Sequence, residues 1–120
     1  MSLPPKSKLK ETLTHYSTTF GAGLVARGIP ARTDGHENNT FAFKNTTDVS
    51  VSVTFEGSDD STFTDAWPLV GSLTLAAGST AATYGYETIT DAWTFVRPVI
   101  TPAGNPTLGS LMWWHMAKGA

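Results

Sequence analysis

The alternation of apolar and polar residues over positions 49–56 limits the folds open to this chain more than any other feature. Valine or phenylalanine occupies every odd position from Val49 to Phe55, and serine, threonine or glutamate occupies the even positions. Because successive side chains of a β strand point to opposite faces of a sheet, this period of two predicts a strand with one buried face. The turn-forming residues Gly57–Asp60 predict that the strand ends in a loop. We interpret the segment as a central strand of a β-sandwich.

Short apolar segments separated by turn-forming residues continue along the chain. The other predicted strands are Phe20–Arg27, Asn39–Lys44, an irregular strand near Trp67–Leu69, Ser72–Leu75, Thr80–Glu87, Asp91–Thr101 and Thr107–Ala117. Turn signals every ~8–12 residues, without intervening helices, are typical of antiparallel sandwiches. We therefore predict an all-β fold, a jelly-roll-like antiparallel β-sandwich of about eight short strands, with a small closed barrel as the alternative.

Three local patterns refine this arrangement. The short polar connection Asn45–Asp48 joins two predicted strands and therefore predicts a β-hairpin. Proline cannot donate a ladder hydrogen bond, so Pro68 predicts an edge or irregular strand, and Pro98 predicts an edge or a bulge. Arg97 lies among aromatic residues, and we expect it to stack on a ring or to pair with a carboxylate of a neighbouring strand.

The length and charge of the chain exclude several classes of protein. A chain of 120 residues forms one domain of ordinary size. The lack of cysteine excludes disulfides and thiolate metal sites, and a net charge of −2 gives no electrostatic footprint for nucleic acid or an anionic membrane. No apolar run is long enough for a membrane-spanning helix, and the first residues lack the apolar region of a signal peptide. We expect synthesis in the cytoplasm, with no nucleic-acid or membrane partner.

Residues 1–19 differ from the rest and are assigned to an N-terminal arm, whereas residues 20–120 are assigned to the β-sandwich domain. Two prolines exclude a helix at the very start, and the lysines that follow form the densest basic cluster of the chain. We predict an extended or partly helical arm that orders on a partner or against its own domain, with a frayed terminus as the alternative for an isolated monomer. The arm residues assigned to an interface are Pro4, Pro5, Lys6, Lys8, Leu9, Lys10 and Leu13.

The double tryptophan of the last predicted strand is the second informative feature. Neighbouring residues of a strand face opposite sides of a sheet, so one of Trp113 and Trp114 enters the core and the other lies outside it. Trp114 is flanked by Met112 and Met116, which makes its face apolar as well. A monomer rarely exposes such a face, so either the arm or a partner subunit is expected to cover it. Trp113, Trp114 and Met116 are therefore also assigned to an interface, although an exposed tryptophan would alternatively stack on a sugar ring.

Residues suited to catalysis or metal binding form no recognisable motif. Asp59, Asp60 and Asp65 lie on one predicted loop, and Ca²⁺ binds such oxygen ligands, but the spacing of an EF-hand is absent. Asx turns explain the first two aspartates without a metal. The three histidines lie on different predicted segments without a second ligand at metal-binding spacing, and no G-x-S-x-G nucleophile motif occurs. We predict no catalytic, cofactor-binding or metal site, and a protein that is not an enzyme.

The order of motifs after residue 40 is distinctive. A valine-rich strand ends in a Glu-Gly-Ser-Asp turn, an aromatic residue and a Leu-x-x-Gly hairpin follow, and an aromatic strand with an embedded arginine leads through a Pro/Gly/Asn turn to the last strand. These motifs lie at Val51–Asp60, Phe63 or Trp67, Leu75–Gly78, Trp93–Thr101, Thr101–Pro106 and Ser110–His115. From about residue 40 to 117 the chain thus resembles small β-sandwich proteins of tailed-phage particles, which occur as capsid decoration, head-fibre and tail-associated proteins.

This resemblance implies a non-enzymatic structural component of a tailed-phage virion, such as a capsid decoration or cement protein or another accessory protein of head or tail. Such a protein acts by protein–protein adhesion to other virion structural proteins, such as the major capsid protein, and forms a homo-oligomer, with a trimer as one option. The motifs also look like those of carbohydrate-binding and discoidin-like sandwiches. A carbohydrate-binding module that uses exposed tryptophans is therefore the alternative. We expect no cofactor, and a location in the virion after synthesis in the host cytoplasm.

Overall fold

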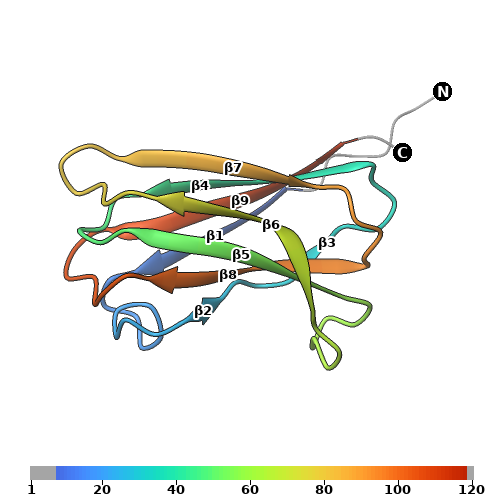
Figure 1. Ribbon diagram of the computed structural model, residues 1–120, viewed down its shortest axis with the longest axis horizontal. Helices are drawn as coiled ribbons and strands as arrows, with labels where there is room; N and C mark the ends of the chain where they lie inside the picture. The colour runs from blue at the N-terminus through green and yellow to red at the C-terminus, as the bar shows by residue number, and fades with distance from the viewer. Residues whose placement is uncertain (1–7, 119–120) are drawn as a thin grey trace.

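The structure, a computed structural model, describes residues 8–118, and that part of the chain forms strands but no helix (Figure 1). The strands are β1 (Lys8–Thr14), β2 (Ala26–Arg27), β3 (Ala31–Arg32), β4 (Asn38–Asn45), β5 (Val51–Ser58), β6 (Trp67–Leu75), β7 (Thr83–Ile89), β8 (Phe95–Pro102) and β9 (Ser110–Lys118). The predicted all-β class is confirmed. Between residues 8 and 118, no helix is available to cross a membrane.

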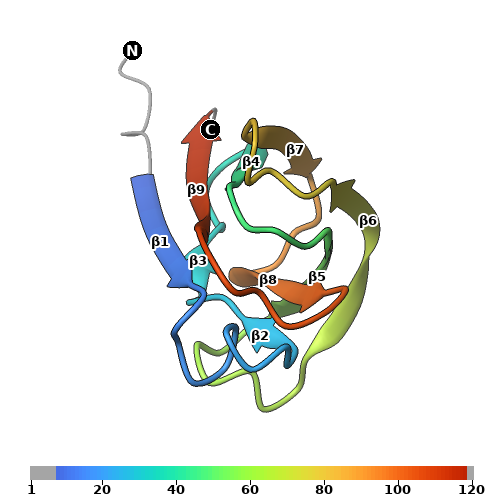
Figure 2. The ribbon, with the colours of Figure 1, turned by 90° about the vertical axis from the view of Figure 1, so that its left-hand side faces the viewer.

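The strands form two antiparallel sheets that pack face to face (Figure 2). One sheet has the order β1-β9-β4-β7, and the other has the order β2-β8-β5-β6, with β3 also paired to β8. Side chains from both sheets meet in the core, where the rings of Phe41 on β4 and Phe55 on β5 lie 5.2 Å apart between centroids. The antiparallel two-sheet arrangement predicted from the sequence is confirmed, and the strands do not form one closed barrel.

The β5 strand has the alternation that its sequence predicts. Val51, Val53 and Phe55 are buried, whereas Ser52 and Thr54 are exposed. β5 pairs with β8 on one side and with β6 on the other, so the prediction of a central sandwich strand is confirmed. Each buried apolar side chain of this size stabilises the fold by about 1.5–3 kcal/mol relative to an exposed position.

The β9 strand is central in the four-stranded sheet, between β1 and β4. Leu111, Trp113 and His115 are fully buried, and the residues between them face outward. The indole of Trp113 packs beside Phe41 and Phe43, with ring centroids 5.9 and 6.3 Å apart. The predicted division of the last strand into two faces is confirmed, and Trp113 is the tryptophan that enters the core.

The predicted hairpin around Asn45–Asp48 is wrong. β4 and β5 lie in different sheets, and this connection carries the chain from one layer to the other. The side-chain amide of Asn45 donates to the carbonyls of Val49 and Ala76, both at 3.0 Å. Its side-chain oxygen accepts from the backbone N–H of Thr47 at 3.0 Å and from the Thr47 hydroxyl at 2.7 Å. The polar residues that look like a hairpin turn instead form a buried hydrogen-bond network that fixes the crossing.

The predicted strand Phe20–Arg27 is also wrong in extent, because only Ala26–Arg27 pairs as β2. The residues before it form turns. The hydroxyl of Ser17 accepts hydrogen bonds from the backbone N–H groups of Phe20 at 2.9 Å and Gly21 at 3.3 Å. Serine hydroxyls offer the backbone such local alternatives to a sheet ladder. Phe20 is nevertheless fully buried, so its apolar character reflects the core and not a strand.

The two prolines of the predicted strands lie where pairing is incomplete. Pro68 lies in β6, one continuous strand that forms an edge of the five-stranded sheet. The predicted edge position of Pro68 is therefore confirmed. Gly71, with a φ of 132°, lies in β6 where its register with β5 shifts. Pro98 lies in β8 opposite the gap between β2 and β3, and its carbonyl accepts from the N–H of Gly28 at 2.8 Å. β8 nevertheless lies inside the sheet and pairs with β5 through Phe55 and Pro98 without a shift in register, so the predicted edge or bulge at Pro98 is wrong; only the pairing on the β2 and β3 side is interrupted there.

The described part of the predicted N-terminal arm begins with β1, an edge strand that pairs with β9 along its length. Leu13 is buried in the core. The Glu11 carboxylate accepts hydrogen bonds from the indole N–H of Trp113 at 2.8 Å and from the backbone N–H of Ile29 at 3.1 Å. Residues 8–14 therefore complete the four-stranded sheet of their own domain in an extended conformation.

Candidate functional site

The outer surface of the four-stranded sheet gathers aromatic and methionine side chains into one patch, which we call the aromatic face. The strand register places Lys10, Trp114, Ala42 and Tyr86 in one row across β1, β9, β4 and β7. A second row beside it brings Met112, Lys44 and Tyr84 together. We define the aromatic face by its outward residues Lys10, Thr12, Ala42, Lys44, Tyr84, Tyr86, Met112, Trp114 and Met116.

The rings of the aromatic face are accessible to a partner. Tyr84 and Tyr86 are 70% and 73% exposed, and Trp114 is half-buried. The ammonium nitrogen of Lys10 lies 5.6 Å from the ring centroid of Trp114, and that of Lys44 lies 5.9 Å from the ring centroid of Tyr84. Each ammonium group therefore lies over a ring at a distance suited to a cation–π contact.

Two open hollows flank Trp114 on this face. One has a volume of about 390 Å³ and is lined by Leu9, Lys10, Trp114, His115 and Met116. The other has a volume of about 460 Å³ and is lined by Ala42, Phe43, Tyr84, Gly85, Tyr86 and Trp114. Because Trp114 separates the two hollows, a partner can pack apolar side chains on both sides of the same indole.

The structure brings together part of the interface predicted from the sequence. Lys10, Trp114 and Met116 lie on the aromatic face. Leu13 and Trp113 are instead 9% and 0% exposed, so both side chains belong to the core and do not reach the surface. Of the other predicted residues, Leu9 packs half-buried against the core, Lys8 pairs through its backbone with Met116, and Pro4, Pro5 and Lys6 lie outside the described residues.

The tyrosines of the aromatic face were not among the residues assigned from the sequence. The alternation over Thr80–Glu87 predicts that Tyr84 and Tyr86 share one face of a strand. Only the position of β4 between β7 and β9 places that face beside Trp114. The sequence thus indicates that the two tyrosines share one face of a strand. It does not indicate which strands are neighbours, so it cannot place that face beside Trp114.

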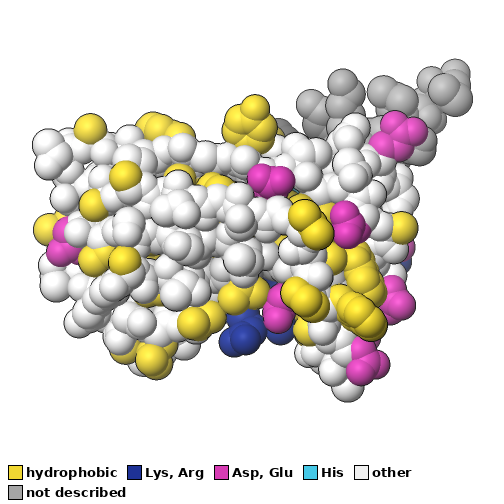
Figure 3. Space-filling view, in the orientation of Figure 1, with side chains coloured by type: hydrophobic (Ala, Val, Ile, Leu, Met, Phe, Trp, Pro, Cys, Tyr) yellow, Lys and Arg dark blue, Asp and Glu magenta, His cyan; other side chains and the backbone are white. Residues whose placement is uncertain are grey.

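A second group of aromatic side chains lies at one end of the five-stranded sheet, in what we call the loop-end hollow. This hollow has a volume of about 550 Å³ and is lined by Ser58, Asp59, Asp60, Thr64, Asp65, Trp67 and Trp93. Trp67 stacks on Trp93 with ring centroids 6.3 Å apart and an angle of 28° between the planes. Figure 3 shows hydrophobic side chains gathered at the end where β6 begins, with Asp and Glu side chains around them.

Asp60 organises the loop that borders the loop-end hollow. Its carboxylate accepts hydrogen bonds from the Ser58 hydroxyl at 2.7 Å, from the Thr64 backbone N–H at 3.3 Å, and from the hydroxyls of Thr62 and Thr64. Hydrogen bonds from Thr62, Ser58 and Thr64 lower the pKa of Asp60 to about 2. This agrees with the Asx-turn interpretation of the loop. Among residues 8–118, no three His, Cys, Asp or Glu side chains are placed to hold a metal ion.

Arg97 makes both contacts that its position predicts. Its Nε donates to the Glu56 carboxylate at 3.0 Å, and its guanidinium carbon lies 4.1 Å from the ring centroid of Phe63. The same carboxylate pairs with Arg27 at 3.6 Å. Arg97 is therefore held by groups of its own chain and has a structural role.

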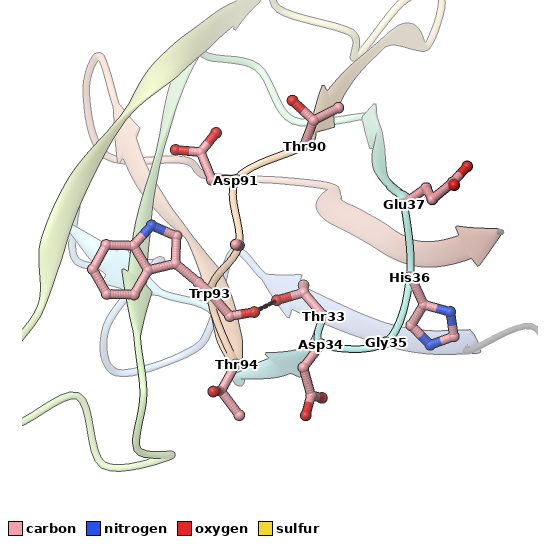
Figure 4. A pocket seen from close by; sticks show the side chains of 10 residues that line it. Thr33, Asp34, Gly35, His36, Glu37, Thr90, Asp91, Trp93 and Thr94 are labelled. Atoms are coloured by element: carbon pink, nitrogen blue, oxygen red, sulfur yellow. Dashed lines mark hydrogen bonds between the residues drawn. The ribbon is translucent and has the colours of Figure 1, made fainter. Parts of the chain in front are cut away.

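A third hollow, of about 430 Å³, lies between residues 33–37 and residues 90–94 (Figure 4). The hydroxyl of Thr33 donates to the backbone carbonyl of Trp93 at 2.6 Å and ties the two segments together. The side chains of His36 and Glu37 point away from the indole of Trp93 (Figure 4). Because these groups do not converge on one point, we assign no site to this hollow.

His115 is a buried histidine at the end of the core beneath the aromatic face. Its Nε2 lies 2.9 Å from the side-chain oxygen of Asn39, and its ring lies 5.0 Å from that of Phe41 between centroids. Burial first, and the charge of nearby His36 second, lower the pKa of His115 from its usual 6.5 to about 4. His115 is therefore neutral in the folded protein at neutral pH, and it belongs to the core.

Comparison of the sequence with models of known protein families and with curated proteins found no match. Function is therefore inferred from the aromatic face and the loop-end hollow themselves.

Proposed function

We propose that this protein is a structural component that assembles by protein–protein adhesion through the aromatic face. The observation that supports this proposal is the gathering of Trp114, Tyr84 and Tyr86, with two methionines, on the outside of a rigid sheet. Monomeric proteins seldom expose contiguous apolar patches larger than a few hundred Å². Tryptophan, tyrosine and methionine are also the residue types enriched in protein interfaces. Binding of a partner would remove this apolar face from water.

The physical properties of the aromatic face suit adhesion. Tryptophan and tyrosine side chains have only two rotatable torsions, so little side-chain entropy is lost when a partner packs on them. Trp114 lies centrally, between two hollows, which is where interface residues of large energetic effect tend to lie. Lys10 and Lys44 add positive charge, and they favour a partner that presents carboxylates.

The charge of the aromatic face also bears on how copies of the chain would associate. Its defining residues include Lys10 and Lys44 but no carboxylate. A twofold contact would bring the lysines of one copy close to those of the other, which is unfavourable. We therefore favour a contact between the aromatic face and a different surface of the next copy, which can close into a ring such as a trimer.

We extend the proposal to the family that the sequence resembles. The chain would be a jelly-roll-like virion protein of a tailed phage, a capsid decoration or cement protein or another head or tail accessory protein. Its partners would be other virion structural proteins, such as the major capsid protein, and its N-terminal arm would contribute through residues before and within β1. Many copies on one particle act together, so each contact can be weak.

Sedimentation velocity on the full-length protein tests the proposal. We expect the wild type to form an oligomer at micromolar concentration and the Trp114→Ser/Tyr86→Ser variant to sediment as a monomer, because two rings of the contact are lost. Val70→Ser provides the control, since Val70 is 96% exposed on β6 and lies outside the aromatic face. A monomeric wild type that also fails to bind phage particles would contradict the proposal, as would an oligomer that survives the double substitution.

Carbohydrate binding is the second candidate, and the exposed rings of the aromatic face favour it. Sugar rings present an apolar C–H surface that stacks on the face of tryptophan or tyrosine. A glycan array and a cellulose or chitin pull-down separate the two candidates. Sugar binding by the isolated wild-type domain that is abolished by Trp114→Ala would favour the carbohydrate module over the structural role.

A further inference from the structure

The loop-end hollow contains an aromatic platform that is independent of the aromatic face. Trp67 is 59% exposed and rests on Trp93. Trp93 in turn lies over Gly57, where an added Cβ would come within 2.5 Å of the indole ring. Gly57 therefore makes room for Trp93, and Trp93 supports an exposed Trp67 ring in a fixed position. An ordered, exposed indole of this kind is ready to receive a ligand.

The loop-end hollow is lined by negative charge. Asp59, Asp60 and Asp65 all contribute to its surface, and none of its lining residues is a lysine or arginine. Asp60 is committed to the hydrogen bonds of its own loop. Asp59 receives only a long contact of 3.5 Å from the Thr94 hydroxyl, and Asp65 is exposed. Two carboxylates beside the Trp67–Trp93 stack are thus available to a ligand.

We propose that the loop-end hollow binds a lysine or arginine side chain presented by a partner protein. A cation over the face of Trp67 is attracted by the electrons of the ring, and tryptophan is the strongest aromatic partner for such a contact. Ionised carboxylates only accept hydrogen bonds, and ammonium and guanidinium groups only donate them. A neutral sugar lacks this charge complementarity. The inference goes beyond the proposed function, because it does not depend on assembly through the aromatic face.

A titration of the full-length, ¹⁵N-labelled protein with short blocked peptides tests this inference. The probes are acetyl-Gly-Lys-Gly-amide and acetyl-Gly-Arg-Gly-amide, and the control is the first peptide with its lysine acetylated. We expect the indole N–H signals of Trp67 and Trp93 to shift with the charged peptides and those of Trp113 and Trp114 to stay in place. Added salt should weaken the binding, because exposed charges are screened.

Charge-neutralising variants sharpen the test. The double variant Asp59→Asn/Asp65→Asn should bind the lysine peptide about tenfold more weakly, because charge-assisted hydrogen bonds are lost. Glu87→Gln removes one charge from β7 of the other sheet and should bind as the wild type does. Asp59 and Asp65 are exposed, so the unfolding midpoint of the double variant should match that of the wild type.

Three results would overturn the inference. The first is the absence of shifts at the Trp67 and Trp93 indoles with both charged peptides. The second is binding that is equal for the acetylated control or unchanged in the double variant. The third is a shift of the same indoles by chitin or cellulose oligosaccharides but not by the charged peptides, which would assign the hollow to a saccharide. None of these results depends on the oligomeric state, so failure of this inference would leave the proposed assembly through the aromatic face untouched.

Discussion

Replacing Trp113 with alanine is expected to lower the free energy of unfolding by about 3–5 kcal/mol, the usual range for a large aromatic residue in a core. Trp113 is fully buried in the central strand of its sheet and packs beside Phe41 and Phe43. Its indole N–H also donates to Glu11 on the edge strand β1. The substitution therefore leaves a cavity and removes one of the two hydrogen bonds that the Glu11 carboxylate accepts, while the bond from the Ile29 N–H remains. Because domains of this size are stable by only about 5–15 kcal/mol, the variant is expected to be close to unfolding.

The neighbouring tryptophan is a matched control for this prediction. Trp114 has the same side chain in the same strand but faces outward, so Trp114→Ala should cost about 1 kcal/mol or less. Trp113→Phe keeps a ring in the core, so its free energy of unfolding should lie between those of the two alanine variants. Denaturant unfolding followed by circular dichroism measures all three. Similar losses for Trp113→Ala and Trp114→Ala would contradict the assignment of the two faces.

Acidification is expected to destabilise the protein between pH 6.5 and pH 4 through His115. In the unfolded chain this histidine takes up a proton near its usual pKa of 6.5, whereas in the folded protein its pKa is lowered to about 4. The unfolded state therefore binds more protons in this window, and stability falls as the pH falls. The shift corresponds to about 3 kcal/mol, fully present above pH 6.5 and lost by about pH 4.

The variant His115→Gln isolates this contribution from that of the carboxylates. Glutamine is uncharged and can still hydrogen bond to Asn39, so the variant should lose less stability on acidification than the wild type does. Urea unfolding of both proteins at pH 7 and near pH 4 gives the comparison, and the difference between them should change by about 3 kcal/mol. Parallel pH dependences for the two proteins would show that His115 is not held neutral by burial.

Properties of single strands could be read from the sequence, whereas the pairing of strands could not. Alternation alone predicts the buried residues of β5 and the two faces of β9, because side-chain direction within a strand is local. The hairpin prediction failed because the chain passes from one sheet to the other after Asn45, whose side-chain amide bonds to Val49 and Ala76. Those bonds depend on a layer crossing that no local pattern encodes. The contacts that decide topology in this fold are long-range.

The same limit applies to the candidate sites. Trp114 could be identified as an outward tryptophan, but Tyr84 and Tyr86 join it only through the register of three strands. The Trp67–Trp93 stack likewise joins the start of β6 to the loop before β8. Each aromatic residue was visible in the sequence, and its neighbours became visible only in the fold.

Oxidative footprinting of the assembled and the dissociated protein tests the central claim, adhesion through the aromatic face, most directly. Hydroxyl radicals label exposed methionine, tryptophan and tyrosine readily, and these residue types make up the face. On assembly we predict reduced labelling of Tyr84, Tyr86, Met112, Trp114 and Met116, with Val70 labelled equally in both states. Equal labelling of the five aromatic-face residues in the two states would contradict the claim.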